Sequence, residues 1–222
     1  MNTRARIIET TLGLFNEHGS GEISTNHIAE ALGISPGNLY YHFRNKEEII
    51  RSIAEQKDSR WESLYHLPQD RAPTLADVEL LVRENFTLVW DYRFFFRELS
   101  ALTQRDPLLK AHYQQLRRER LAAFEGLFAQ FVSAGVARPT ASPPLVANLA
   151  KVCWLISDYW LPFLEIDGDL TLPDGIEQGV ALYLQVLEPY VSDAGKARAI
   201  DTNGADTSSR RVPQQNSTKK AG

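Results

Sequence analysis

Cysteine is nearly absent from this chain of 222 residues, because Cys153 is the only one. A single thiol excludes an internal disulfide and any metal site built from several thiolates, so we expect a protein of the reducing cytoplasm. The five histidines include no His-x-x-x-His pair. The sequence therefore predicts no metal site.

Long apolar runs and a targeting segment are also missing. The most apolar stretch, residues 147–164, carries Lys151 and Asp158, which favours a buried helix over a membrane span. The N-terminus enters a charged helical pattern at Arg4 without the apolar segment of a signal peptide. We therefore expect no association with a membrane.

An excess of basic residues is missing as well. The formal net charge is −4, and residues 1–60 hold seven Lys or Arg against eight Asp or Glu. This balance argues against a protein that coats nucleic acid without sequence preference. It leaves open a dimer that reads a defined site, because the placement of charge matters more than its sum.

Strand patterns are absent, whereas apolar residues recur at helical spacing along most of the chain. The sequence thus predicts an all-α protein with domains at residues 1–60 and 61–191. The proline-bearing connector 67–74 is the best candidate for a break in the chain and would leave the helix before it as a bridge between the domains. From Ser192 onward apolar residues are scarce, so residues 192–222 are predicted to be a disordered tail. Outside the motif described next, helices are expected near residues 3–18, 46–66, 75–91, 93–103, 106–134, 145–164 and 176–190.

The most informative segment is residues 24–43, which reads as two short helices joined by a tight turn at Gly33. Ser24 stands at the N-cap position of the first helix. Ser35 caps the second helix, and Pro36 occupies its first position, where proline is favoured. This arrangement is typical of a helix-turn-helix unit that delivers its second helix into the DNA major groove. The inward positions are Ile28, Ala29, Leu32, Leu39 and Phe43.

Four short segments occur in order after the first predicted helix: Ser-Thr-x-x-Ile-Ala, Ala-Leu-Gly-Ile-Ser, Gly-Asn-Leu-Tyr-Tyr-His-Phe and Asn-Lys-Glu-Glu. Over residues 3–60 this pattern resembles the DNA-binding domain of TetR-type transcriptional regulators. The resemblance implies an N-terminal three-helix helix-turn-helix domain followed by a larger helical domain for effector binding and dimerisation. It also implies a regulator rather than an enzyme, more a repressor than an activator, which a ligand releases from a pseudo-palindromic operator of double-stranded DNA.

The outward positions of the motif carry side chains suited to DNA. Hydroxyl and backbone N–H groups at a helix start suit a phosphate, and an amide suits an adenine edge. Aromatic rings suit phosphates or thymine methyl groups. The predicted DNA contacts are Ser24, Thr25, Asn26, Ser35, Pro36, Gly37, Asn38, Tyr40, Tyr41, His42 and Lys46.

Several of these positions have a purely structural alternative. Ser24 would serve as a cap without touching DNA, and one of Tyr40 and Tyr41, with Tyr41 the more outward by its spacing, could belong to the core. Lys46 could be solvated surface instead of a phosphate contact. Ile23 departs from the family pattern, in which many members have a second small hydroxyl residue there.

The second domain is rich in large aromatic residues, which are typical of a core, of a dimer interface or of an apolar ligand pocket. On the third interpretation we expect an apolar or aromatic small-molecule effector and no cofactor. The predicted pocket residues are Trp90, Arg93, Phe94, Tyr113, Trp154, Ser157 and Asp158.

The last two predicted helices carry broad apolar stripes that suit a four-helix packing between two copies of the chain. Two alternatives remain open at this point. One is a helical DNA-binding protein without a ligand, and the other is a helical enzyme that retains the motif, although nothing in the sequence marks a nucleophile. The predicted dimer stripes are Leu145, Leu149, Val152, Cys153, Ile156 and Trp160, then Ile176, Val180, Tyr183, Leu184 and Leu187.

Overall fold

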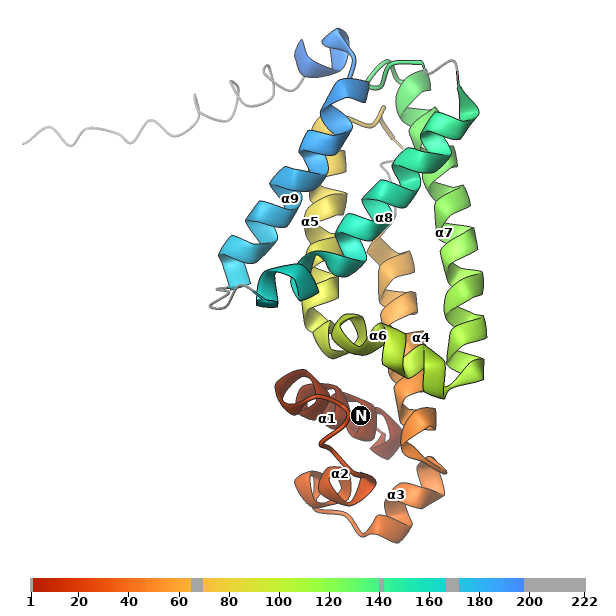
Figure 1. Cartoon of the computed structure of the whole chain (residues 1–222), viewed down its shortest axis with the longest axis vertical. Coiled ribbons are helices and arrows are strands. Elements are labelled where there is room, and N and C mark those ends of the chain that lie inside the picture. Colours follow the sequence, from red (N-terminus) through yellow and green to blue (C-terminus); the bar gives the residue numbers. More distant parts are fainter. Residues whose placement is uncertain (1, 65–69, 140–141, 167–171, 198–222) are drawn as a thin grey trace, which may run out of the picture.

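The computed structural model describes residues 2–64, 70–139, 142–166 and 172–197. Within these ranges the chain is helical, and its only strand-like feature is an isolated bridge between Ala137 and Val191. The elements are α1 (Thr3–His18), α2 (Thr25–Leu32), α3 (Pro36–His42), α4 (Lys46–Leu64), α5 (Leu75–Asp91), α6 (Arg93–Arg105), α7 (Pro107–Ser133), α8 (Pro143–Ile166), α9 (Leu172–Leu187) and the 3₁₀ turn η1 (Glu188–Tyr190) (Figure 1).

The predicted all-α class is confirmed, and most helices begin and end close to the expected residues. Helix α8 continues through Pro162 to Ile166, two residues beyond the predicted end at residue 164. Leu161 beside this proline is almost fully buried, so packing there holds the helix together across the missing N–H group. The Asp-Gly-Asp segment at residues 167–169, between the last two predicted helices, lies outside the described residues.

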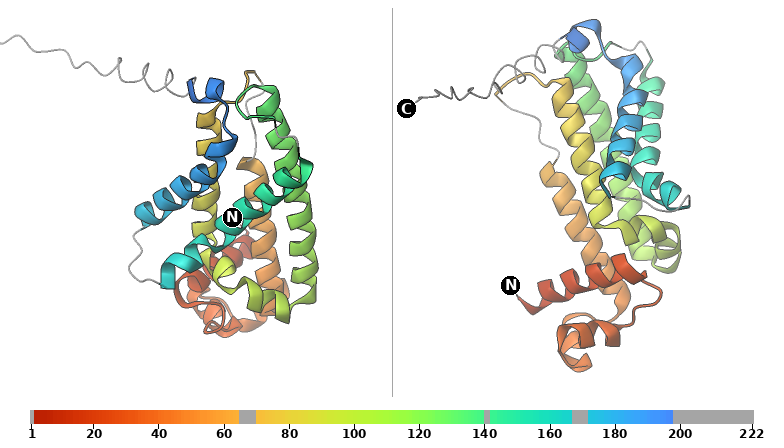
Figure 2. Two further views of the ribbon diagram at one scale, coloured as in Figure 1. Left: turned by 45° about the horizontal axis from the view of Figure 1, so that its top comes forward. Right: turned by 90° about the vertical axis from the view of Figure 1, so that its left-hand side faces the viewer.

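The first domain is built from α1, α2, α3 and the first half of α4, and it forms one end of an elongated molecule (Figure 2). Apolar residues from all four helices meet in its core, as the sequence pattern predicted. α4 then runs on into the second domain, so a single helix bridges the two. The most buried core residues are Ile7, Phe15, Ile28, Leu39, Phe43, Ile49 and Ile53.

The end of α1 is fastened to the start of α6 in the second domain. The side-chain amide of Asn16 donates to the Asp91 carbonyl at 2.7 Å, and its oxygen accepts from the Phe94 N–H at 3.1 Å. Glu98 on α6 accepts from the backbone N–H of Ser20 at 2.7 Å and also from the Ser20 hydroxyl. These contacts, called the α1–α6 junction below, fix how the first domain sits on the second.

The predicted dimer stripes on α8 and α9 were both wrong in part. Leu149 and Cys153 face inward, where they pack with Val180 and Tyr183 of α9 in the core of a single chain. Helix α8 is apolar on nearly every side, so its periodicity could not indicate which face turns inward. The stripe that stays exposed, called the outer α8 face below, consists of Leu145, Val152, Leu155, Tyr159, Phe163 and Ile166.

The predicted tail is not wholly disordered, because the chain stays ordered past Ser192 and forms a short helical turn over residues 193–197. The Ser192 N–H donates to the Val136 carbonyl at 2.9 Å, and the Arg138 N–H donates to the Tyr190 carbonyl at 2.7 Å. These bonds fasten the C-terminal segment to the link between α7 and α8. The rest of the predicted tail lies outside the described residues.

Candidate DNA-binding site and ligand cavity

The turn between α2 and α3 has the geometry that the sequence predicted. Ser24 caps α2 by accepting from the His27 N–H at 3.2 Å, and His27 Nδ1 accepts from the Ser24 N–H at 3.3 Å. Gly33 ends α2 in the left-handed conformation, with φ 65° and ψ 32°, which residues with a Cβ adopt only with strain. The short turn that results sets α3 at a fixed angle to α2.

Helix α3 is held by one face and exposes the other. Its Ser35 cap accepts from the Asn38 N–H at 3.2 Å, and Leu39 on its inner face is fully buried. On the outer face Asn38 is exposed, and the Tyr41 side chain is 85% exposed although it is large and aromatic. A short helix that exposes an amide and an aromatic ring has the chemistry to read base edges.

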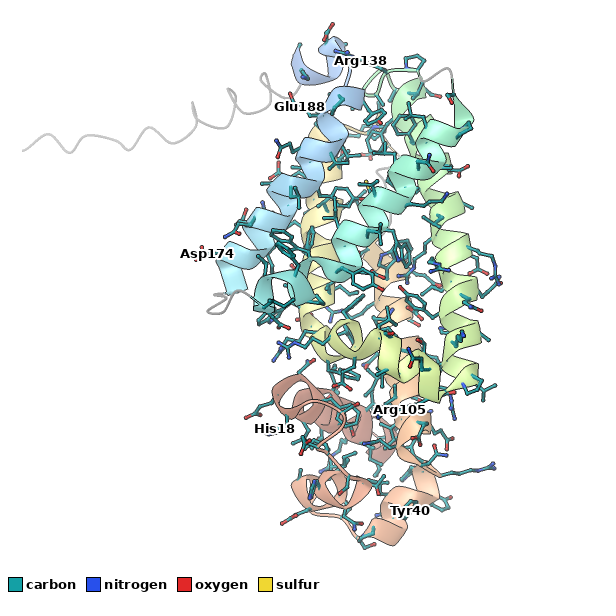
Figure 3. The ribbon with its side chains drawn as sticks, in the orientation of Figure 1. His18, Tyr40, Arg105, Arg138, Asp174 and Glu188 are labelled. Atoms are coloured by element: carbon teal, nitrogen blue, oxygen red, sulfur yellow. The ribbon has the colours of Figure 1, made fainter. Side chains whose placement is uncertain are left out.

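The tip of the domain lies at the far end of the molecule from the second domain, where Tyr40 is found (Figure 3). The Tyr40 hydroxyl lies 3.0 Å from the Thr25 hydroxyl, which places the start of α2 beside α3. A Cβ added at Gly37 would meet only the Ser35 hydroxyl at 3.9 Å, so this backbone is open to a close approach. The predicted contacts Asn26, Pro36 and His42 are also at least partly exposed on these two helices.

Lys46 has a structural role that the sequence did not indicate. Its ammonium donates to the carbonyls of Ser20 at 2.6 Å and of Ile23 at 3.1 Å, which ties the start of α4 to the loop before α2. Ile23 itself is buried, so its side chain belongs to the core and not to a DNA contact. Sequence reasoning missed Arg44, which is exposed directly after α3 and is a cation suited to a phosphate.

The second domain contains a cavity of about 370 Å³ between α5, α7 and α9, called the distal cavity below. Its walls are mainly aliphatic and aromatic, and the charged residues that line it are Glu79, Glu188 and Lys196. The apolar residues that line it are Leu75, Ala76, Val78, Leu81, Val82, Phe124, Leu127, Phe128, Phe131, Val136, Ala137, Tyr183, Leu184, Leu187, Tyr190 and Val191.

The predicted pocket residues do not form one site, and none of them lines the distal cavity. Trp154, Ser157 and Asp158 line a smaller space of about 60 Å³, and the Tyr113 hydroxyl donates to the Asp158 carboxylate. Phe94 is fully buried against Phe15 at the α1–α6 junction, with ring centroids 5.1 Å apart. The remaining two pair with each other: the Arg93 guanidinium lies 4.8 Å from the Trp90 ring centre.

A cluster of charged side chains fills the middle of the second domain. Asp58 on α4 accepts from the Lys57 ammonium at 2.5 Å and from Arg120 Nη2 at 3.2 Å, and it lies 2.7 Å from His112 Nε2. Lys57 and Asp58 are only 2% and 6% exposed. Burial lowers the pKa of the Lys57 ammonium, whereas the charge of Asp58 opposes that shift. This arrangement compensates charges that would otherwise be costly to bury.

Asp158 on α8 is a second buried acid near this cluster. Burial raises the pKa of its carboxyl from 3.8 to about 6, although the Tyr113 hydrogen bond and the charges of Lys57 and Arg120 act in the opposite direction. Burial and the Asp158 charge together raise the pKa of the Tyr113 hydroxyl. The folded protein therefore holds the Asp158 proton more tightly than the unfolded chain does.

We expect the stability of the protein relative to its Asp158→Asn variant to fall by about 2 kcal/mol as the pH rises from about 4 to about 7. The folded pKa of about 6 lies above 3.8, so ionisation favours the unfolded chain within this window. Asparagine keeps an acceptor for Tyr113 and does not titrate. Urea denaturation of both proteins at the two pH values tests this, and parallel pH profiles would contradict it.

Among the described residues, no group of three or more His, Cys, Asp or Glu side chains is arranged to hold a metal ion. Cys153 is buried, and burial raises the pKa of its thiol to about 11. Over the same residues, none of the helices combines the length and the apolar character that crossing a membrane requires.

Two family models match the chain one after the other. Residues 7–53 match the family described as bacterial regulatory proteins, tetR family, and residues 58–199 match the family described as bacterial transcriptional repressor. The HTH-type transcriptional regulator QacR of Staphylococcus aureus is 29% identical over 104 residues, 47% of this chain and 48% of QacR. The HTH-type transcriptional regulator UidR of Escherichia coli is 40% identical over 58 residues, 26% of this chain and 30% of UidR. The chain thus spans about half the length of QacR and less than a third of UidR.

Solved structures match almost the whole chain. A TetR-family transcriptional regulator from Marinobacter aquaeolei VT8 is 35% identical, with a TM-score of 0.81 over 92% of this chain and 98% of that protein. The structure of AibR in complex with isovaleryl coenzyme A and operator DNA has a TM-score of 0.59 at 20% identity, over 82% of this chain and 97% of AibR. The latter likeness shows a shared fold.

Proposed function

The chain belongs to the TetR family of bacterial transcriptional regulators, and we propose that it is a dimeric repressor in the cytoplasm that leaves its operator when a small molecule binds. The family consists of DNA-binding regulators and not of enzymes, so no catalytic role is assigned to the chain. The observation that carries the proposal is the exposed outer face of α3. This helix lies at one end of the molecule (Figure 1).

The side chains on the outer face of α3 are suited to contact with another molecule and do not stabilise the folded chain. Tyr41 is exposed almost completely and Asn38 is exposed beside it, while Leu39 alone anchors the helix within the same turn. A monomer gains no free energy of folding from exposing a large ring. A DNA groove would cover this ring and pair the neighbouring amide with a base edge.

Dimerisation is proposed through the outer α8 face. Six large apolar side chains on one side of α8 stay exposed, with only the Phe163 ring seen to stack on Trp160 among the described residues, and a stripe of this size marks an interaction surface. A second copy related by a two-fold axis would present the same stripe and cover it. The dimer would then place two α3 helices in successive major grooves, about 34–36 Å apart or a multiple of that distance.

Release from DNA is proposed as a shift between two arrangements of the first domain on the second. The α1–α6 junction sets that arrangement through Asn16 and Glu98, so a ligand that displaces the elements holding these residues changes the direction of α3. A ligand acts in this way only to the extent that it binds one arrangement more tightly than the other.

Selection of bound sequences from random duplex DNA tests the proposed function. We expect a pseudo-palindromic site with half-sites separated by about one helical turn or a multiple of it, because both subunits present the same helix. The selected duplex should then bind one dimer, which sedimentation of the protein and the complex would show. Recovery of no common sequence would overturn the proposal, and a single unpaired half-site would overturn its dimeric form.

A further inference from the structure

We propose that the effector site is the distal cavity and that it takes an uncharged, mainly apolar small molecule with an aromatic or branched body. This inference rests on the proposed function, since it assigns the ligand and its place to the release step. The cavity volume of about 370 Å³ lies at the lower end of the usual range for small-molecule pockets, about 300–1,000 Å³.

The middle of the second domain holds a much smaller space. The space beside Trp154 and Asp158 measures only about 60 Å³, and its walls include Arg120, which is paired with the buried Asp58. A ligand there would have to displace buried ion pairs, which is costly because each partner would be left uncompensated. The distal cavity is thus the better-formed binding space of the two.

The charged residues at the distal cavity argue for an uncharged ligand. Glu188 is paired with Lys196, whose ammonium lies 3.1 Å from its carboxylate. Glu79 lies 3.2 Å from Arg83, a guanidinium that also pairs with Glu177. The charges that line the cavity are thus engaged in ion pairs with neighbouring side chains, whereas the walls favour apolar surface.

The C-terminal segment closes one end of this cavity. Tyr190, Val191 and Lys196 all line it, and the Ala137–Val191 bridge holds the segment against the link between α7 and α8. Gly195 allows this close approach, because an added Cβ would lie 2.6 Å from the Val136 carbonyl oxygen. The order of residues 192–197, which the sequence did not predict, therefore helps to form a wall of the site.

The cavity lies at the end of the molecule opposite α3: Arg138 and Glu188 appear at one end of Figure 3 and Tyr40 at the other. Helix α5 connects the two regions. Its first half lines the cavity from Leu75 to Val82, and its last residue, Asp91, accepts the Asn16 amide at the α1–α6 junction. A ligand that moves the start of α5 would therefore move the acceptor that holds α1, about 25 Å away along one rigid helix.

Binding of N-phenyl-1-naphthylamine, an uncharged aromatic dye that fluoresces in apolar surroundings, tests the site without DNA. We expect Leu184→Trp on α9 and Leu127→Trp on α7, which fill the cavity from two walls, to weaken dye binding at least tenfold. Leu80→Trp on α5 is the matched control, because Leu80 is exposed and does not line the cavity, and its affinity should stay within twofold. Unchanged dye binding in both cavity variants would overturn the proposal.

The charge of the ligand is tested with 8-anilino-1-naphthalenesulfonate, the sulfonated form of the same dye. We expect it to bind at least tenfold more weakly, and equal or tighter binding would overturn the uncharged class. Retained operator binding by Leu184→Trp or Leu127→Trp would show that a variant is folded. Loss of dye binding in a variant that still binds the operator supports the inference. Failure of the wild-type protein to select an operator contradicts only the proposed function.

Discussion

Alanine at Asn38 or at Tyr41 is expected to weaken operator binding by between one and four orders of magnitude. A well-formed base contact contributes about 1–3 kcal/mol, and both subunits of a dimer carry the change, so the loss per operator doubles to about 2–6 kcal/mol. Fluorescence anisotropy with the selected duplex measures this directly. These two residues are the strongest candidates because both are exposed on the outer face of α3.

The same substitutions should leave the free energy of unfolding nearly unchanged. Neither side chain contributes to the apolar core of the domain, and surface substitutions of this kind usually stay within about 0.5 kcal/mol. Gln114→Ala is a matched control, because it truncates an exposed amide on α7, which belongs to the second domain. If both α3 variants bound the operator with the same affinity as the wild-type protein and the Gln114→Ala control, Asn38 and Tyr41 would not be DNA contacts.

The first domain could be predicted in detail because its determinants are local. Ser24, Gly33 and Ser35 fix helix ends through contacts with residues at most five positions away, and the structure confirms all three. The burial of Leu39 and Phe43 follows from the spacing of a single short helix whose other face is polar. A local pattern of this kind can be interpreted without knowledge of the rest of the fold.

The second domain could not be predicted equally well, because its determinants are distant in sequence. Periodicity did not indicate which side of α8 faces inward, since Cys153 and Leu155 are both apolar and only the first is buried. Among the aromatic residues predicted to line a pocket, Phe94 packs at the α1–α6 junction, and Trp154 lines only the smaller space of about 60 Å³. The distal cavity depends on α5, α7, α9 and residues 190–196 meeting at one end, which no local pattern specifies.

The charged cluster around Asp58 is the clearest example of a feature that could not be predicted from the sequence. His112 and Arg120 lie 54 and 62 positions from Asp58, and all three residue types are ordinary on a helix surface. Only the packing of α4 against the rest of the second domain buries Asp58 beside Arg120, with His112 at the exposed edge of the cluster. Its consequences for stability are correspondingly large.

Asp58→Ala is expected to lower the free energy of unfolding by about 3–5 kcal/mol, because it removes the carboxylate that compensates buried cations. Lys57 is 2% exposed and loses its 2.5 Å partner, and Arg120 loses the same acceptor while it stays stacked 3.7 Å above the Trp61 ring. Urea denaturation measures the change. Asp193→Ala is the matched control: its ion pair with Arg138 is exposed, so its loss should cost at most about 1 kcal/mol.

The cost in Asp58→Ala should come from the cations left behind and not from the lost carboxylate itself. Adding Lys57→Met removes the most deeply buried of these cations while keeping a side chain of similar length beside the Phe95 and Phe96 rings, which Lys57 now faces at 5.1 and 5.8 Å. The double variant should therefore be more stable than Asp58→Ala alone. This result is possible only if the effects of the two substitutions are coupled. If the losses of stability caused by Asp58→Ala and by Lys57→Met simply added, the ion pair would not be the source of the instability. The cluster would then be a set of independent side chains that stabilise the fold by packing alone.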